Sequence, residues 1–74
     1  MITPTLSRAA RVLLGWRQEE LAKRSEVSLT AIRQFEGNKT ATPHRTTLKA
    51  LQQAFEDAGI EFIDDNGIGV KLKG

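Results

Sequence analysis

The 74-residue chain contains no cysteine, so it can form neither a disulfide framework nor a cysteine-based metal site. It also lacks an apolar run long enough to span a membrane, and its N-terminus lacks the basic-then-apolar layout of a signal peptide. We therefore expect a single cytoplasmic domain over residues 1–74 that has no membrane partner. A core of this length is marginal, and association with a partner often stabilises such domains.

Groups suited to catalysis are also scarce. The single histidine, His44, lies beside Pro43 in a polar stretch, and no pair of carboxylates falls in a plausible cleft. The GIG sequence at residues 67–69 lacks the longer pattern of a phosphate-binding glycine loop. We expect no enzyme activity, no cofactor and no metal ion.

Charge is spread unevenly, although the formal net charge is only +2. Residues 1–49 carry nine lysine or arginine and four glutamate side chains, a balance of +5, whereas residues 50–74 carry two lysines and five acidic side chains, a balance of −3. A basic helical part with an acidic tail suits a protein that meets nucleic-acid phosphates with one end. A chance distribution of charge on a small soluble domain explains the pattern equally well.

Residues 17–39 show two short helical patterns joined by a tight turn, and helices joined by so few residues must cross steeply. Ser28 suits the N-cap of the second helix, because its hydroxyl can accept from a free backbone N–H. Gly37 and then Asn38 suit its end, since both tolerate a left-handed cap. The residues at helical spacing are Leu21, Ala22 and Ser25 in the first helix, and Leu29, Ile32, Phe35 and Glu36 in the second.

The sequence QEELAKRSEVSLTAIRQFEGN, residues 18–38, closely resembles the helix-turn-helix of phage repressor and Cro-type regulators, the xenobiotic-response-element family. The resemblance extends over residues 5–58. It implies a mostly α fold, a four- or five-helix repressor-like DNA-binding domain. The positions that match the family pattern are Gln18, Leu21, Ala22, Val27, Ser28, Ile32, Phe35 and Glu36.

Two positions depart from the commonest family pattern. Glu26 stands where the turn often has glycine, and a left-handed Glu26 would cost of order ~1 kcal/mol that glycine avoids. Arg17 stands where a serine or threonine cap is common, so only the Glu20 half of a capping box remains. Both departures predict modest stability.

The rest of residues 1–58 predicts two further helices. Thr3 and Pro4 suit the start of a helix that runs to about Leu14 and is ended by Gly15. Its predicted inner residues are Leu6, Ala9, Ala10, Leu13 and Leu14, and its predicted outer residues are Arg8 and Arg11. The second of these helices starts within residues 43–46, runs to Ala58 before Gly59, and has Leu48, Leu51, Ala54, Phe55 and Ala58 on its inner stripe. Trp16 is either an exposed stacking aromatic or a packing residue at a helix junction, and we favour the second.

Residues 59–74 form a different unit, in which strands at about 60–64 and 69–73 flank the turn signal Asp65-Asn66-Gly67. This C-terminal β-hairpin is too small to be stable alone. It must pack on the first or last helix of residues 1–58, or pair with a second copy, as strands do in Cro proteins. Dimerisation through this tail, dimerisation through the last helix, and a monomer all remain open.

The family resemblance implies how double-stranded DNA is read. The second helix of the motif would lie in the major groove, where Gln34 can bond adenine and Arg33 can reach guanine or a phosphate. The implied base contacts are Leu29, Thr30, Arg33 and Gln34. The implied phosphate contacts are Gln18, Ser28, Asn38, Lys39, Thr40 and Arg45.

These residues predict a sequence-specific transcription regulator that reads inverted-repeat operators as a homodimer and, by association with the family, controls a phage or mobile element. It would work at the nucleoid. Glu19, Glu20 and Glu36 are candidate contacts for RNA polymerase, and a masking protein is another possible partner. The alternatives are an antitoxin or interaction module that uses the tail, and a DNA-binding unit recruited by another chain.

Overall fold

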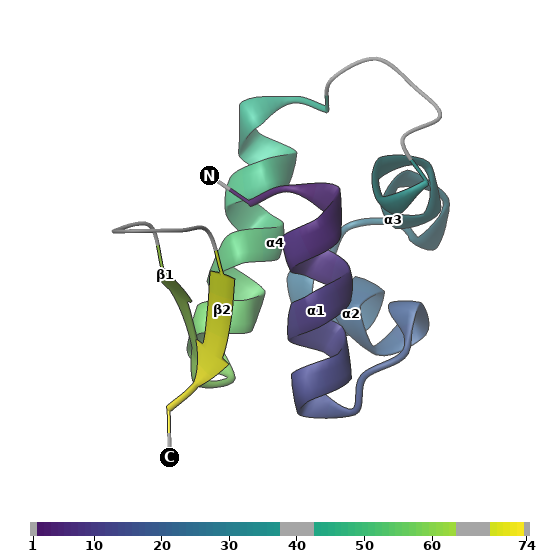
Figure 1. Cartoon of the computed structure of the whole chain (residues 1–74). Helices are drawn as coiled ribbons and strands as arrows, with labels where there is room; N and C mark the ends of the chain where they lie inside the picture. The colour runs from purple at the N-terminus through teal and green to yellow at the C-terminus, as the bar shows by residue number, and fades with distance from the viewer. Residues whose placement is uncertain (1, 38–42, 64–68, 74) are drawn as a thin grey trace.

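The computed structural model describes residues 2–37, 43–63 and 69–73, which form four helices followed by a β-hairpin (Figure 1). The mostly α architecture with a C-terminal hairpin confirms the predicted fold class. No helix in the described ranges is both long and apolar enough to cross a bilayer. The elements are α1 (Pro4–Leu14), α2 (Gln18–Ser25), α3 (Leu29–Glu36), α4 (Arg45–Asp57), β1 (Ile60–Ile63) and β2 (Gly69–Leu72).

Side-chain caps begin two of the helices. The Thr3 hydroxyl accepts from the Leu6 N–H at 3.2 Å, with Pro4 at the first position of α1. The Ser28 hydroxyl accepts from the Ala31 N–H at 3.1 Å at the start of α3. Each bond satisfies a backbone donor that a helix end leaves free, and both predicted caps are confirmed.

The helix ends match the prediction only in part. Gly15 ends α1 in the left-handed conformation, with φ 70°. Gly37 has φ −86° and ψ −3°, so the prediction of a left-handed cap there is wrong. Its N–H donates to the Arg33 carbonyl at 2.9 Å, which continues the right-handed hydrogen-bonding pattern of α3 by one residue. Asn38, the other residue predicted for this cap, lies outside the described residues.

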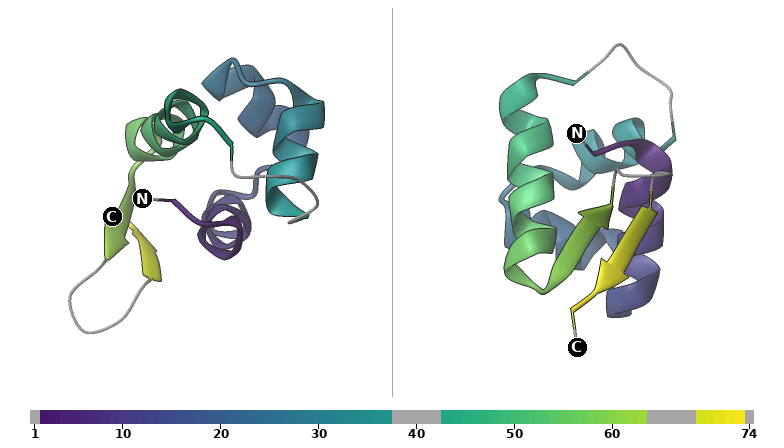
Figure 2. Two further views of the ribbon diagram at one scale, coloured as in Figure 1. Left: turned by 90° about the horizontal axis from the view of Figure 1, so that it is seen from above. Right: turned by 60° about the vertical axis from the view of Figure 1, so that its left-hand side comes forward.

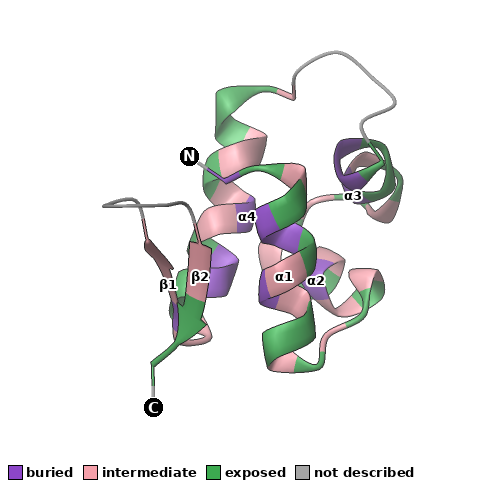
Figure 3. Ribbon diagram, in the orientation of Figure 1, coloured by how far each residue is buried: buried purple, intermediate pink, exposed green. Residues whose placement is uncertain are grey.

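The core lies where the helices and the hairpin meet (Figure 3). The ring of Trp16 stacks on Phe55 with 5.7 Å between centroids, and the Arg24 guanidinium lies 4.9 Å from the Trp16 centroid. Trp16 is therefore a packing residue at the α1–α2 junction, as predicted. The buried apolar residues are Ile2, Leu6, Ala10, Leu21, Ile32, Phe35, Leu51, Ala54, Phe55 and Ile60.

One side of α1 differs from its predicted inner face. Leu13 is 45% exposed, so its predicted burial is wrong, and the neighbouring Val12 is 78% exposed. The reason is the rotation of α1, which turns Arg11 toward α3. Leu13, two residues on and about 200° around the helix, therefore lies on the side of α1 away from α3.

The hairpin packs on both candidate helices, β1 against α4 and β2 against α1 (Figure 2). The two strands are antiparallel, with Phe62 opposite Val70 and Ile60 opposite Leu72. The second strand ends at Leu72, one residue earlier than predicted, and residue 64, the predicted end of the first strand, lies outside the described residues. The predicted turn falls within residues 64–68, outside the described residues.

Replacing Glu26 with glycine should stabilise the protein. Glu26 caps the C-terminus of α2 at φ 61°, the one positive φ found for a described non-glycine residue. Relief of this strain is worth about 1 kcal/mol, so Glu26→Gly should raise the melting temperature by roughly 4–8 °C. Thermal unfolding followed by circular dichroism measures the change.

Gly15→Ala is the matched reverse substitution. Gly15 has φ 70°, and an added Cβ there meets no atom within 4 Å, so the expected fall in melting temperature reports backbone strain without a clash. Glu26→Gln separates the loss of charge from the relief of strain. A lower melting temperature for Glu26→Gly than for the unsubstituted protein would contradict the strain assignment.

Candidate nucleic-acid interface

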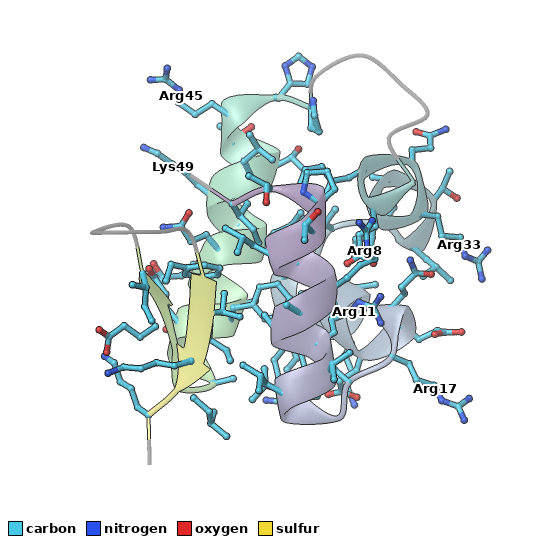
Figure 4. The ribbon with its side chains drawn as sticks, in the orientation of Figure 1. Arg8, Arg11, Arg17, Arg33, Arg45 and Lys49 are labelled. Atoms are coloured by element: carbon cyan, nitrogen blue, oxygen red, sulfur yellow. The ribbon has the colours of Figure 1, made fainter. Side chains whose placement is uncertain are left out.

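The helix α3 presents a polar outer face. Of the four predicted base contacts, Thr30, Arg33 and Gln34 are exposed and Leu29 is half-buried. Figure 4 shows Arg33 pointing away from the rest of the protein. These side chains offer the donors and acceptors that read base edges in a major groove. The opposite face of α3 is held in the protein by Ile32, Phe35 and Glu36, all buried.

The N-terminus of α2 places Gln18 at its first position, half-buried. The Gln18 Nε2 donates to the Glu36 Oε1 at 3.1 Å. An amide nitrogen carries two hydrogens, so this bond fixes the amide and leaves one hydrogen for an outside acceptor such as a phosphate oxygen. The Glu20 carboxylate, predicted as half of a capping box, instead accepts from Arg24 Nε at 2.7 Å.

Arg17 is a candidate that the sequence interpretation missed. It is the N-cap residue of α2, it makes no side-chain capping bond, and it is exposed. Figure 4 shows its guanidinium pointing outward on the same side of the protein as Arg33. A basic residue directly before the predicted phosphate contact Gln18 was the available signal.

Arg45 lies apart from the α3 side chains. It is the exposed first residue of α4, and Figure 4 shows it beside Lys49, projecting to the side opposite Arg33. Ser28, by contrast, directly precedes α3. Three predicted phosphate contacts lie outside the described residues: Asn38, Lys39 and Thr40.

Glu36, the last residue of α3, is buried, with a side chain that is only 2% exposed. It was a candidate contact for RNA polymerase, and its burial shows that this prediction is wrong. The carboxylate receives Arg11 in bidentate fashion, with Nη2 at 2.7 Å from Oε1 and Nε at 3.0 Å from Oε2. The hydroxyl of buried Ser7 donates to Oε2, and Gln18 donates to Oε1. All four side chains together are called the Glu36 cluster below.

Arg11 does not lie on the outer side of α1, so that prediction is wrong. A buried carboxylate needs a charged partner, and Arg11 supplies it with a side chain that is 17% exposed. Its Nη1 also donates to the Trp16 carbonyl at 3.3 Å, which ties the α1–α2 connection to the same group. Arg8 is exposed as predicted, but its guanidinium donates to the main-chain carbonyl of Glu36.

The contacts of the Glu36 cluster set the pKa of the carboxyl. Burial raises the pKa of Glu36, because a charge loses its water. The hydrogen bonds from Arg11, Ser7 and Gln18, together with the positive charge of Arg11, outweigh burial and leave the pKa below its ordinary 4.5. Glu36 is therefore a carboxylate at neutral pH, and it holds α1, α2 and α3 together.

A family model described as Helix-turn-helix matches residues 8–57, more than half of the chain. The matched range contains α2, α3 and α4, and it ends before the hairpin. No curated protein matches the chain.

The Glu36 cluster should make stability depend on pH. The pKa of Glu36 is lower in the native state than in the unfolded chain, so the ionised carboxylate stabilises the native state. This stabilisation is complete above the ordinary pKa of 4.5 and is lost as the pH falls through the lowered pKa. Urea unfolding at about pH 6 and about pH 3 measures this loss.

Glu36→Gln is the matched control, because a glutamine cannot titrate and the other carboxylates remain. This substitution should reduce the free energy of unfolding by roughly 3–5 kcal/mol at neutral pH. The free energy of unfolding of the variant should then fall less on acidification than that of the unsubstituted protein. Equal falls for both proteins would show that Glu36 does not carry the linkage.

Proposed function

Because the chain belongs to the Cro/C1-type helix-turn-helix family of DNA-binding regulators, we propose that it recognises a specific operator sequence with α3 in the major groove. The exposed polar face of α3, supported by its buried opposite face, carries the proposal. The groove admits a helix and displays base edges in patterns that distinguish all four base pairs.

Base reading is assigned to four side chains of α3. Gln34 bonds the N6 and N7 positions of an adenine, and Arg33 bonds a guanine or a nearby phosphate. Thr30 bonds a base edge or contacts a thymine methyl. Leu29, apolar and half-buried, contacts thymine methyls and favours A·T pairs at its position.

Phosphate contacts would fix the register of α3 on the duplex. Gln18, with its amide already oriented by Glu36, offers its second hydrogen to a phosphate, and exposed Arg17 adds a charge beside it. Arg45 reaches the backbone at a separate point, from the start of α4. Ser28, Asn38, Lys39 and Thr40 complete the proposed phosphate contacts.

Two copies of the chain would occupy one operator. A single α3 of eight residues makes few base contacts, and two copies centred about one DNA turn apart on an inverted repeat double that number. The proposed homodimer forms through the hairpin, through α4, or only on DNA. Such a regulator would act in the cytoplasm at the nucleoid, in a phage or mobile element. Exposed Glu19 remains available to RNA polymerase.

The first test is fluorescence anisotropy with DNA from upstream of the protein's own gene and with a scrambled duplex of equal length, at two salt concentrations. Tight, salt-sensitive binding to the native fragment alone supports a sequence-specific regulator, and the stoichiometry gives the copies per site. Weak, equal binding to both duplexes would reject the proposal in favour of an interaction module that uses the tail.

Base and phosphate contacts should respond differently to substitution. Gln34→Ala should weaken binding to the operator by about 1–3 kcal/mol and relax its specificity. Arg17→Ala and Arg45→Ala should weaken binding to all DNA alike and flatten its salt dependence. The same anisotropy assay measures both effects.

Matched controls lie far from α3 in the chain. Gln53→Ala removes an exposed glutamine of α4, and Lys73→Ala removes an exposed charge of the tail. Binding is compared on a duplex that carries one half-site, where dimerisation does not contribute, and both variants should leave that affinity unchanged. Identical behaviour of Gln34→Ala and Arg17→Ala would overturn the division between base and phosphate contacts.

A further inference from the structure

The outer edge of β2 presents backbone groups without a partner in the ladder. The Lys73 N–H donates to the Gly59 carbonyl directly opposite, at 2.8 Å. Because bonded and non-bonded pairs alternate along an antiparallel ladder, Lys71 also belongs to a bonded pair. The N–H and C=O groups of Val70 and Leu72 therefore point away from β1. Outside the ladder, no described backbone group bonds to either residue.

The sheet also stops short of covering α1. Although β2 packs on α1, Val12 remains 78% exposed, Leu13 45% and Leu72 46%. These three are the large apolar residues found exposed in the described part of the chain. In the right-hand view of Figure 2, β2 lies across α1 with its free edge on the side away from β1 and α4. Strands lie about 4.8 Å apart, so one more strand there would extend the layer over α1.

The charges at this edge determine which kind of strand can pair with it. Lys71 and Lys73 are exposed and alternate with Leu72, so they lie on the solvent face of the hairpin. A second copy pairing β2 with β2 around a two-fold axis centred on Lys71 or Leu72 would place Lys71 opposite Lys71 or Lys73 of that copy. Like charges directly opposite each other are destabilising, and edge lysines are a known protection against self-pairing. An acidic strand would reverse the sign of this interaction.

We propose that the outer edge of β2 accepts a strand from an acidic partner protein. The strand's backbone bonds to the outward N–H and C=O groups of Val70 and Leu72, as in other cases of strand addition. Its apolar side chains turn toward Val12, Leu13 and Leu72, and its acidic side chains stand opposite Lys71 and Lys73. This pattern of alternating acidic and apolar residues is what the surface would recognise.

The β2 edge is separate from the proposed DNA contacts. In Figures 1 and 2, β2 and α3 lie on opposite sides of α1. A partner strand would therefore leave α3 uncovered, and the regulator could carry its partner to an operator. Loss of strand binding and loss of DNA binding are thus separable results.

The test is an NMR titration of the full chain with an eight-residue peptide of alternating glutamate and valine, blocked at both ends. Binding should be saturable and should slow amide hydrogen exchange at Val70 and Leu72, whose N–H groups acquire acceptors. The added strand is antiparallel to β2, so the apolar residues of the peptide stand directly opposite Val70 and Leu72, in bonded pairs. N-methylation of the peptide's valines should therefore abolish binding, and N-methylation of its glutamates should not.

Two variants of the protein test the side chains. The double substitution Lys71→Glu/Lys73→Glu should weaken peptide binding roughly tenfold, since two exposed attractions become repulsions. Val12→Ser should weaken it less, through lost apolar contact. All three positions are exposed, so an unchanged amide spectrum elsewhere shows that folding is intact, and affinity for a duplex with a single half-site should stay unchanged.

Three results would overturn the proposal. The first is no binding of the peptide, which would leave the edge lysines with only a protective role. The second is equal affinity for the two N-methylated peptides, or an affinity for a lysine–valine peptide equal to that for the glutamate–valine peptide. The third is slowed exchange at Val70 and Leu72 in the protein alone that increases with its concentration, which would identify a second copy as the occupant.

Discussion

The buried ion pair between Glu36 and Arg11 is the interaction on which the arrangement of the first three helices depends. A charge without its partner in this position costs several kcal/mol, a large share of the stability of a domain of this size. Glu36 also receives Ser7 and Gln18, so donors from α1 and α2 meet on the last residue of α3. Any shift of α3 against these helices would break several charge-assisted bonds at once, which disfavours other packings of the same helices.

Local features of the sequence were enough to predict much of the fold. The Ser28 cap and the alternating strands follow from short-range chemistry, and the structure has them. The left-handed conformation of Glu26 was suggested only by the family resemblance, which often has glycine at that position. The failures at Arg11 and Leu13 share one long-range cause. Periodicity alone predicts that an arginine on a helix is exposed to solvent. Arg11 faces the protein because it pairs with the buried carboxylate 25 residues later, and this rotation of the helix leaves Leu13 exposed.

The candidate DNA site was predictable to a similar extent. The motif spacing located the exposed face of α3, because burial on one side of a short helix determines what the other side presents. It could not show that the amide of Gln18 is held by Glu36, since that bond joins the first residue of α2 to the last of α3. Arg17 was missed because its position was considered only as a helix cap, and its exposure depends on how α2 is placed.

The separation of α3 into two faces has an evolutionary consequence. The buried face is constrained by the Glu36 cluster, whereas the side chains of Thr30, Arg33 and Gln34 make no hydrogen bond to any described residue. Substitutions at such exposed positions usually change stability by about 0.5 kcal/mol or less. Descendants of this chain can therefore exchange their reading side chains, and diverge toward new operators, without first acquiring compensating mutations in the core.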